Sequence, residues 1–100
     1  MHKDMDALLH GLARREDRVV TLQSALTACP ALGPDNGGDG EQAKAALVVD
    51  WLRACGISDL VHVNAPDHRV SSGTRPNLVA RIPGRTRRTL WLFGHMDVVP

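Results

Sequence analysis

Cysteine and aromatic residues are both scarce in this sequence. Its 100 residues include only two cysteines, Cys29 and Cys55, and three aromatic side chains, Trp51, Trp91 and Phe93. Two cysteines cannot form a disulfide framework, and these two stand too far apart for the Cys-x-x-Cys spacing of a structural zinc site or a redox pair. Three rings are too few for a surface that stacks nucleic-acid bases. We therefore expect two reduced thiols that pack as small apolar groups, and no nucleic-acid partner.

Neither sign of charge dominates, and no long apolar run is present. Lys and Arg number 12 against 11 Asp and Glu, so the formal net charge is +1. Such a balance creates no field that would attract nucleic acid or an anionic membrane. Residues 1–6 include acids where a secretory signal has bases, and no apolar run approaches the roughly 20 residues of a membrane-spanning helix. We expect a cytoplasmic protein with no membrane partner.

Hydrophobic residues make up 43% of the chain, enough to bury the core of one domain. Residues 30–40 are rich in Pro, Gly, Asp and Asn, which predicts an exposed loop. As a domain boundary this loop would leave two pieces too small for separate cores, so we place it inside a single domain. It lacks the Gly-Lys-Ser/Thr ending of a phosphate-binding loop, which disfavours phosphate binding.

Two helices are predicted in the first half of the chain. The first has apolar residues at intervals of three and four, but its periodicity does not decide whether residues 14–18 are a solvated turn or a break. The second is predicted from about Gly40 to Cys55, with Asp39 and Gln42 as a capping box and Gly56 as its left-handed end. The apolar positions of the first helix are Met5, Leu8, Leu9, Leu12, Val19, Leu22 and Leu26.

Strands are predicted in the second half. Alternating apolar residues indicate strands over residues 59–65 and 77–82, with a polar, mobile loop over residues 66–76. Residues 90–93 are apolar on both faces, as in a central strand that helices cover on both sides. The basic residues 85–88 are expected at a solvated hairpin tip. The predicted fold class is α/β, with two amino-terminal helices packing on a mixed sheet.

His95 and Asp97 form the candidate site. His95 follows the end of the predicted central strand, and open α/β sheets place their sites at the carboxyl ends of strands. Residues two apart in an extended segment point to the same side, so Asp97 can accept a ring N–H of His95 and leave the other nitrogen for a metal. The alternatives are a histidine that faces solvent or is satisfied within the core, and an aspartate that caps the following turn.

Two motifs add a resemblance to these residues. They are Arg-Pro-Asn-Leu-Val-Ala-Arg-Ile-Pro-Gly at residues 75–84 and Thr-Leu-Trp-Leu-Phe-Gly-His-Met-Asp-Val-Val-Pro at residues 89–100. Both resemble the zinc-dependent exopeptidase and deacylase family of succinyl-diaminopimelate desuccinylase, acetylornithine deacetylase, aminoacylase and glutamate carboxypeptidase. The loop at residues 37–41 and the helix end at residues 52–56 are also similar to that family, so the resemblance extends from about Thr21 onward.

The resemblance implies a metal-dependent hydrolase that cleaves an amide bond of an N-acyl amino acid or a small peptide. It implies two zinc ions per full-length subunit, replaceable by a divalent metal such as cobalt, with His95 as a metal ligand and Asp97 as the catalytic residue that orients it. Residues 1–100 would then be the amino-terminal part of a single α/β catalytic domain. The other ligands and a lid domain that forms a homo-oligomer would lie downstream, and this segment alone would be inactive.

A second hypothesis keeps a different class of function open. The chain could be a non-catalytic α/β interaction module, or an inactive relative, that works through an exposed strand or through the loop at residues 30–40. The other four histidines, His2, His10, His62 and His68, are expected to be structural or solvated, since none has ligand spacing to His95. Asn77 is expected to satisfy local backbone groups.

Overall fold

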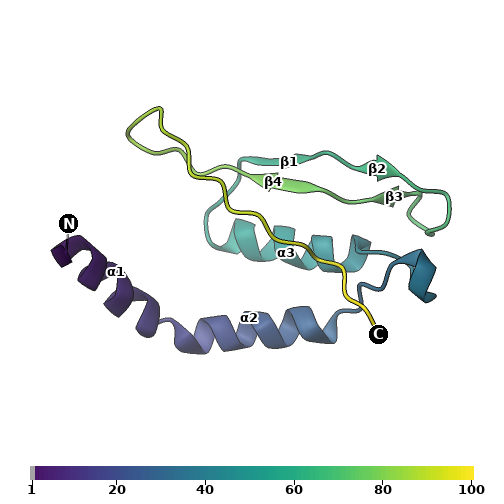
Figure 1. Cartoon of the computed structure of the whole chain (residues 1–100), viewed down its shortest axis with the longest axis horizontal. Coiled ribbons are helices and arrows are strands. Elements are labelled where there is room, and N and C mark those ends of the chain that lie inside the picture. The colour runs from purple at the N-terminus through teal and green to yellow at the C-terminus, as the bar shows by residue number, and fades with distance from the viewer. Residues whose placement is uncertain (1) are drawn as a thin grey trace.

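Three α-helices precede an antiparallel β-ribbon and an extended carboxy-terminal segment (Figure 1). The computed structural model describes residues 2–100. The two sheets, β1 with β4 and β2 with β3, are both two-stranded and antiparallel, so the predicted α/β class is confirmed. The elements are α1 (His2–Ala13), α2 (Glu16–Ala28), the short 3-10 helix η1 (Pro34–Asn36), α3 (Gln42–Ala54), β1 (Leu60–His62), β2 (Ala65–Pro66), β3 (Thr74–Arg75) and β4 (Leu78–Ala80).

The first periodic stretch is two helices with a break between them. The backbone N–H of Arg15 bonds the carbonyl of Leu12 at 2.9 Å, which closes a turn after α1. Glu16 and Asp17 then begin α2, where carboxylates favour a helix start through the helix dipole. Figure 1 shows α1 extending away from the other elements, with the apolar side chains of Met5 and Leu8 more than half exposed.

The end of α3 is as predicted, but its start is not. Gly56 has the left-handed φ of 83° that closes the helix, and its N–H bonds the carbonyl of Arg53 at 2.9 Å. At the other end the cap is Glu41, and no side chain bonds a free N–H there. The predicted capping box of Asp39 and Gln42 is wrong, because the Asp39 carboxylate is taken by a distant partner described below.

The helical spacing of Ala43, Leu47, Trp51 and Ala54 predicts one apolar side for α3, but a different side is buried. Ala45 and Val49 are the buried apolar residues of this helix, whereas Ala43 and Ala54 are exposed. Apolar residues cover most of the circumference of α3, so the sequence pattern could not select one side. The choice follows from where the β-ribbon and the extended segment lie against the helix.

The two small sheets are parts of one continuous ribbon. Leu60 lies opposite Ala80 and Ala65 lies opposite Arg75, so the two sheets share one register. Between them the N–H of Val63 bonds the carbonyl of Asn77 at 2.9 Å. The Asn77 side chain donates in turn to the carbonyl of Val63 at 3.0 Å, so its role is structural, but the backbone group that it satisfies lies across the ribbon and is not local.

Residues 90–93 do not form the predicted central strand, and the mixed sheet does not form. No strand is present over these residues, and their side chains are largely exposed, with Leu92 at 86% and Phe93 at 89%. In residues 2–100 the parallel contact is an isolated bridge between Leu32 and Val98. The apolar pattern was compatible with a buried strand, but the backbone has no neighbour within hydrogen-bonding distance, so that prediction is wrong.

The described residues form an elongated body with a small core. The radius of gyration is 16.2 Å, against about 13 Å for a compact domain of this length. The buried apolar side chains are Ala31, Ala45, Val49 and Val70. Because the core is so small, much apolar surface faces solvent, and such surface commonly marks an interaction site.

No helix in residues 2–100 combines the length and the apolar content that crossing a bilayer requires.

Candidate functional site

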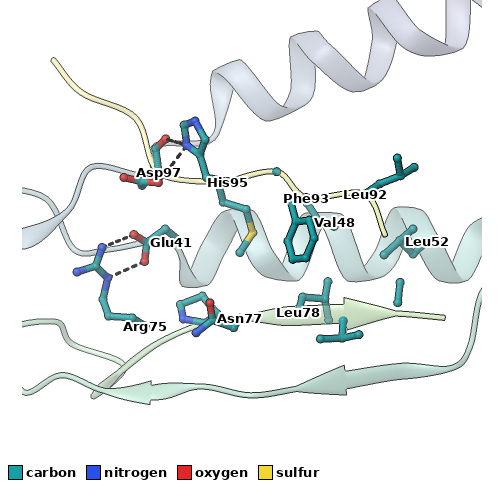
Figure 2. Close-up of a pocket in the computed structure, with 15 residues that line it drawn as sticks. Glu41, Val48, Leu52, Arg75, Asn77, Leu78, Leu92, Phe93, His95 and Asp97 are labelled. Atoms are coloured by element: carbon teal, nitrogen blue, oxygen red, sulfur yellow. Dashed lines mark hydrogen bonds and ion pairs between the residues drawn. The ribbon is translucent and has the colours of Figure 1, made fainter. Parts of the chain in front are cut away.

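His95 and Asp97 contact each other directly. The ring Nδ1 of His95 lies 3.1 Å from Oδ1 of Asp97 and 3.0 Å from the Asp97 backbone carbonyl (Figure 2). Both neighbours are acceptors, so Nδ1 is the nitrogen that donates when the ring is neutral. The described contacts of the ring are at Nδ1, which leaves Nε2 as the nitrogen with a lone pair for a ligand.

Both side chains of the pair are more than half exposed to solvent. The side chain of His95 is 83% exposed and that of Asp97 is 53% exposed. An exposed pair of this kind contributes little to stability, since water competes for both groups. Its geometry is therefore better explained by local chain direction than by burial. After the apolar residues 90–93, the extended backbone places positions 95 and 97 on the same side.

An open groove runs beside this pair. Its volume is about 720 Å³, and its walls come from α3, from β4 and from residues 92–97. Figure 2 shows Val48, Leu78 and Phe93 along its apolar part. Its volume lies within the range of small-molecule sites and more of its lining is apolar than polar, but the groove is open to solvent.

A salt bridge between Glu41 and Arg75 closes one end of the groove. Arg75 donates through Nε to Oε2 of Glu41 at 2.8 Å, and its terminal nitrogen pairs with the other carboxylate oxygen (Figure 2). The Glu41 side chain is only 7% exposed and that of Arg75 is 28% exposed. The hydrogen bonds from Arg75 lower the pKa of Glu41, although burial and the nearby charge of Asp97 act in the opposite direction. Glu41 therefore stays ionised and held, which does not suit a general base.

Sequence reasoning gave no role to this salt bridge. Glu41 and Arg75 are 34 residues apart, and no local pattern connects them. Both residues belong to segments that carry the family resemblance, the loop at residues 37–41 and the motif at residues 75–84. That shared membership is the one feature of the sequence that links them.

Further ion pairs extend from Arg75 to the tip of the ribbon. A terminal nitrogen of Arg75 lies 3.5 Å from Oδ2 of Asp67. Arg69 donates through Nε to Oδ1 of Asp67 at 2.9 Å, and through a terminal nitrogen to Oδ1 of Asp35 at 2.9 Å. The hydrogen bonds from Arg69 hold the pKa of Asp67 far below its ordinary value. Ion pairs thus connect this end of the ribbon to the loop before α3, and residues 66–76, which were predicted as a loop, include β3 and the last residue of β2.

A second contact joins the same two segments. The Asp39 carboxylate accepts the backbone N–H of Ser71 at 2.7 Å and the Ser71 hydroxyl. These hydrogen bonds from Ser71 lower the pKa of Asp39. The contact explains why Asp39 does not cap α3, because both carboxylate oxygens are directed at Ser71.

In the described chain, His95 is not part of a cluster of side chains that could together hold a metal ion. Among residues 2–100, no three His, Cys, Asp or Glu side chains lie close enough together to hold a metal ion. The other histidine sites are separate; His10, for example, places Nδ1 2.7 Å from the carbonyl of Asp6 in α1. A catalytic zinc centre generally uses three protein ligands. The residues here therefore fit one ligand position of such a centre and not a whole centre.

Nothing similar was found elsewhere. Comparison with family models, with curated proteins and with solved structures finds no match for this chain. The resemblance to the zinc exopeptidases therefore stays a prediction made from residues 75–84 and 89–100. The groove and the pair of His95 and Asp97 are the features of this chain that bear on its function.

Proposed function

We propose that this chain supplies part of the active site of a metal-dependent hydrolase that cleaves an amide bond of an N-acyl amino acid or a small peptide. The observation that supports it is the contact of His95 Nδ1 with Asp97 Oδ1 at 3.1 Å, beside an apolar groove. Asp97 fixes the ring and raises its basicity, and Nε2 of His95 is then a ready zinc ligand. Bound zinc would polarise the scissile carbonyl and lower the pKa of the attacking water.

The groove would bind the part of the substrate that lies beyond the scissile amide. Its apolar residues, including Val48, Leu52 and Leu78, would receive the acyl group or the amino-acid side chain while the amide lies near His95. Because residues 2–100 supply one ligand, the remaining ligands and the general base have to come from other polypeptide. The 100 residues by themselves should bind zinc weakly and should not hydrolyse amides.

Zinc binding to His95 is the direct test on this chain. Zinc added to the isotopically labelled protein should shift the imidazole resonances of His95 in two-dimensional NMR spectra. Asp97→Ala should weaken that binding by about tenfold, because the ring loses its orienting carboxylate. His62→Ala is the matched control, since His62 is an exposed histidine of the ribbon, and it should leave the titration of His95 unchanged.

Two outcomes would contradict the proposal. If zinc leaves the His95 resonances unchanged, His95 is not a ligand and the interaction-module hypothesis explains the chain better. If His95→Ala, made in a longer polypeptide that contains this chain, still hydrolyses N-acetyl and N-succinyl amino acids at the original rate, the hydrolase does not use His95.

A further inference from the structure

The most exposed apolar segment of the molecule is also an unpaired extended chain. The exposed fractions of residues 90–93 are 83% for Leu90, 62% for Trp91, 86% for Leu92 and 89% for Phe93. Within the described residues this segment belongs to neither sheet. An extended, apolar segment whose backbone groups lack strand partners is a template for pairing with another strand.

We propose that residues 87–97 pair antiparallel with the same residues of a second copy, so that two chains form a symmetric dimer through a shared two-stranded ribbon. The proposal does not depend on metal binding or on the hydrolase function. It commits to a second copy because the sequence of this segment is complementary to itself when one chain is reversed. Two-fold dimers use the same patch on both subunits, which requires such self-complementarity.

Charge favours the antiparallel direction and is compatible with a register centred on Leu92. The segment is basic at one end, at Arg87 and Arg88, and acidic at the other, at Asp97. Antiparallel pairing with Leu92 opposite Leu92 of the other copy places Arg87 opposite Asp97 at both ends. Parallel pairing would instead set the basic residues of the two copies against each other, and like charges in opposite positions destabilise a sheet.

The aromatic residues favour the same register. Trp91 and Phe93 already lie on one side of the chain, with ring centroids 5.9 Å apart and planes inclined by 18°. Antiparallel pairing about Leu92 puts Trp91 of each copy opposite Phe93 of the other. The four rings then form one cluster, and aromatic pairs across strands are among the favourable cross-strand contacts.

Sedimentation velocity over a concentration series tests the dimer. The wild-type chain should pass from monomer to dimer as its concentration rises, and Leu92→Lys should raise the dissociation constant at least tenfold. Leu8→Lys is the matched control, because Leu8 is also an exposed leucine, at 56%, but lies on α1. Both leucines are exposed in the single chain, so neither substitution should alter the circular dichroism spectrum.

A cysteine pair tests the register independently. In a chain with Cys29→Ser and Cys55→Ser, Leu92→Cys should form a disulfide-linked dimer on oxidation, since opposed residues in a ribbon lie about 4.5–5.5 Å apart. Trp91→Cys should not, because residue 91 faces residue 93. A chain that stays monomeric at every concentration would overturn the proposal. So would a dimer that Leu8→Lys dissociates and Leu92→Lys does not, which would assign the interface to α1.

Discussion

Arg75→Met is expected to lower the free energy of unfolding by about 2 kcal/mol. The substitution keeps most of the apolar stem of Arg75 but leaves the Glu41 carboxylate, which is 7% exposed, without its cation. Removing one partner of a fully buried ion pair costs about 3–5 kcal/mol, and the 28% exposure of Arg75 reduces that figure. Urea denaturation followed by circular dichroism measures the loss.

Arg81→Met is the matched control for that prediction. Arg81 bonds Asp59 at 2.9 Å at the other end of the ribbon, but the two side chains are 79% and 45% exposed. Exposed ion pairs contribute about 0–1 kcal/mol, so this variant should unfold close to the wild type. Equal losses for the two arginines would show that burial of Glu41 is not what makes the salt bridge with Arg75 important. A double-mutant cycle with Arg75→Met, Glu41→Gln and both together separates the energy of the Glu41–Arg75 interaction from the separate effects of the two side chains.

The same salt bridge predicts a dependence of stability on acid. The folded state lowers the pKa of Glu41 from its ordinary value of 4.5, so the unfolded chain binds the proton more readily. The stabilisation is therefore fully present above pH 4.5 and is lost as the pH falls through the lower, folded value. Asp39 and Asp67 shift in the same direction. Thermal unfolding between about pH 7 and pH 2 should show this decline, and Arg75→Met should show a smaller one.

Gly38→Ala is expected to lower the free energy of unfolding by about 3 kcal/mol, which is the other large effect. A Cβ on Gly38 would lie 2.1 Å from the backbone oxygen of Leu32 and 2.4 Å from its Cβ. Neither atom is the end of a flexible side chain, so the loop itself has to move. That movement would break the bond from the N–H of Gly40 to the carbonyl of Leu32, which is 2.9 Å long. Denaturant unfolding measures the effect.

The consequence of Gly38→Ala should reach the candidate site. Leu32 pairs with Val98, and the N–H of Val98 bonds the carbonyl of Ala31 at 3.1 Å, so the loop at residues 30–40 anchors the chain just after Asp97. NMR resonances of residues 95–98 should therefore shift in the variant. Gly84→Ala is the control, since nothing lies within 4 Å of its added Cβ, and it should change stability by less than about 0.5 kcal/mol. A similar loss for both variants would contradict the steric explanation.

One part of the candidate site, the contact of His95 with Asp97, could be predicted from the sequence, and the groove could not. The contact of His95 with Asp97 depends on a two-residue spacing in an extended chain, which is a local property of the backbone. The groove beside it could not be predicted, because its walls come from α3, β4 and residues 92–97, which are separated along the chain. The Glu41 carboxylate at its end depends on Arg75, at a separation of 34 residues.

The sequence by itself determined the features that depend on neighbours along the chain. These are the helical segments, the left-handed end of α3 at Gly56, the extended segments that become β1 and β4, and the side on which His95 and Asp97 meet. Only the tertiary structure decided which side of α3 is buried, that Asp39 binds Ser71 instead of capping the helix, and that residues 90–93 stay unpaired. Periodicity reports what one segment favours, whereas a hydrogen bond or a buried contact also requires a second segment at the right distance.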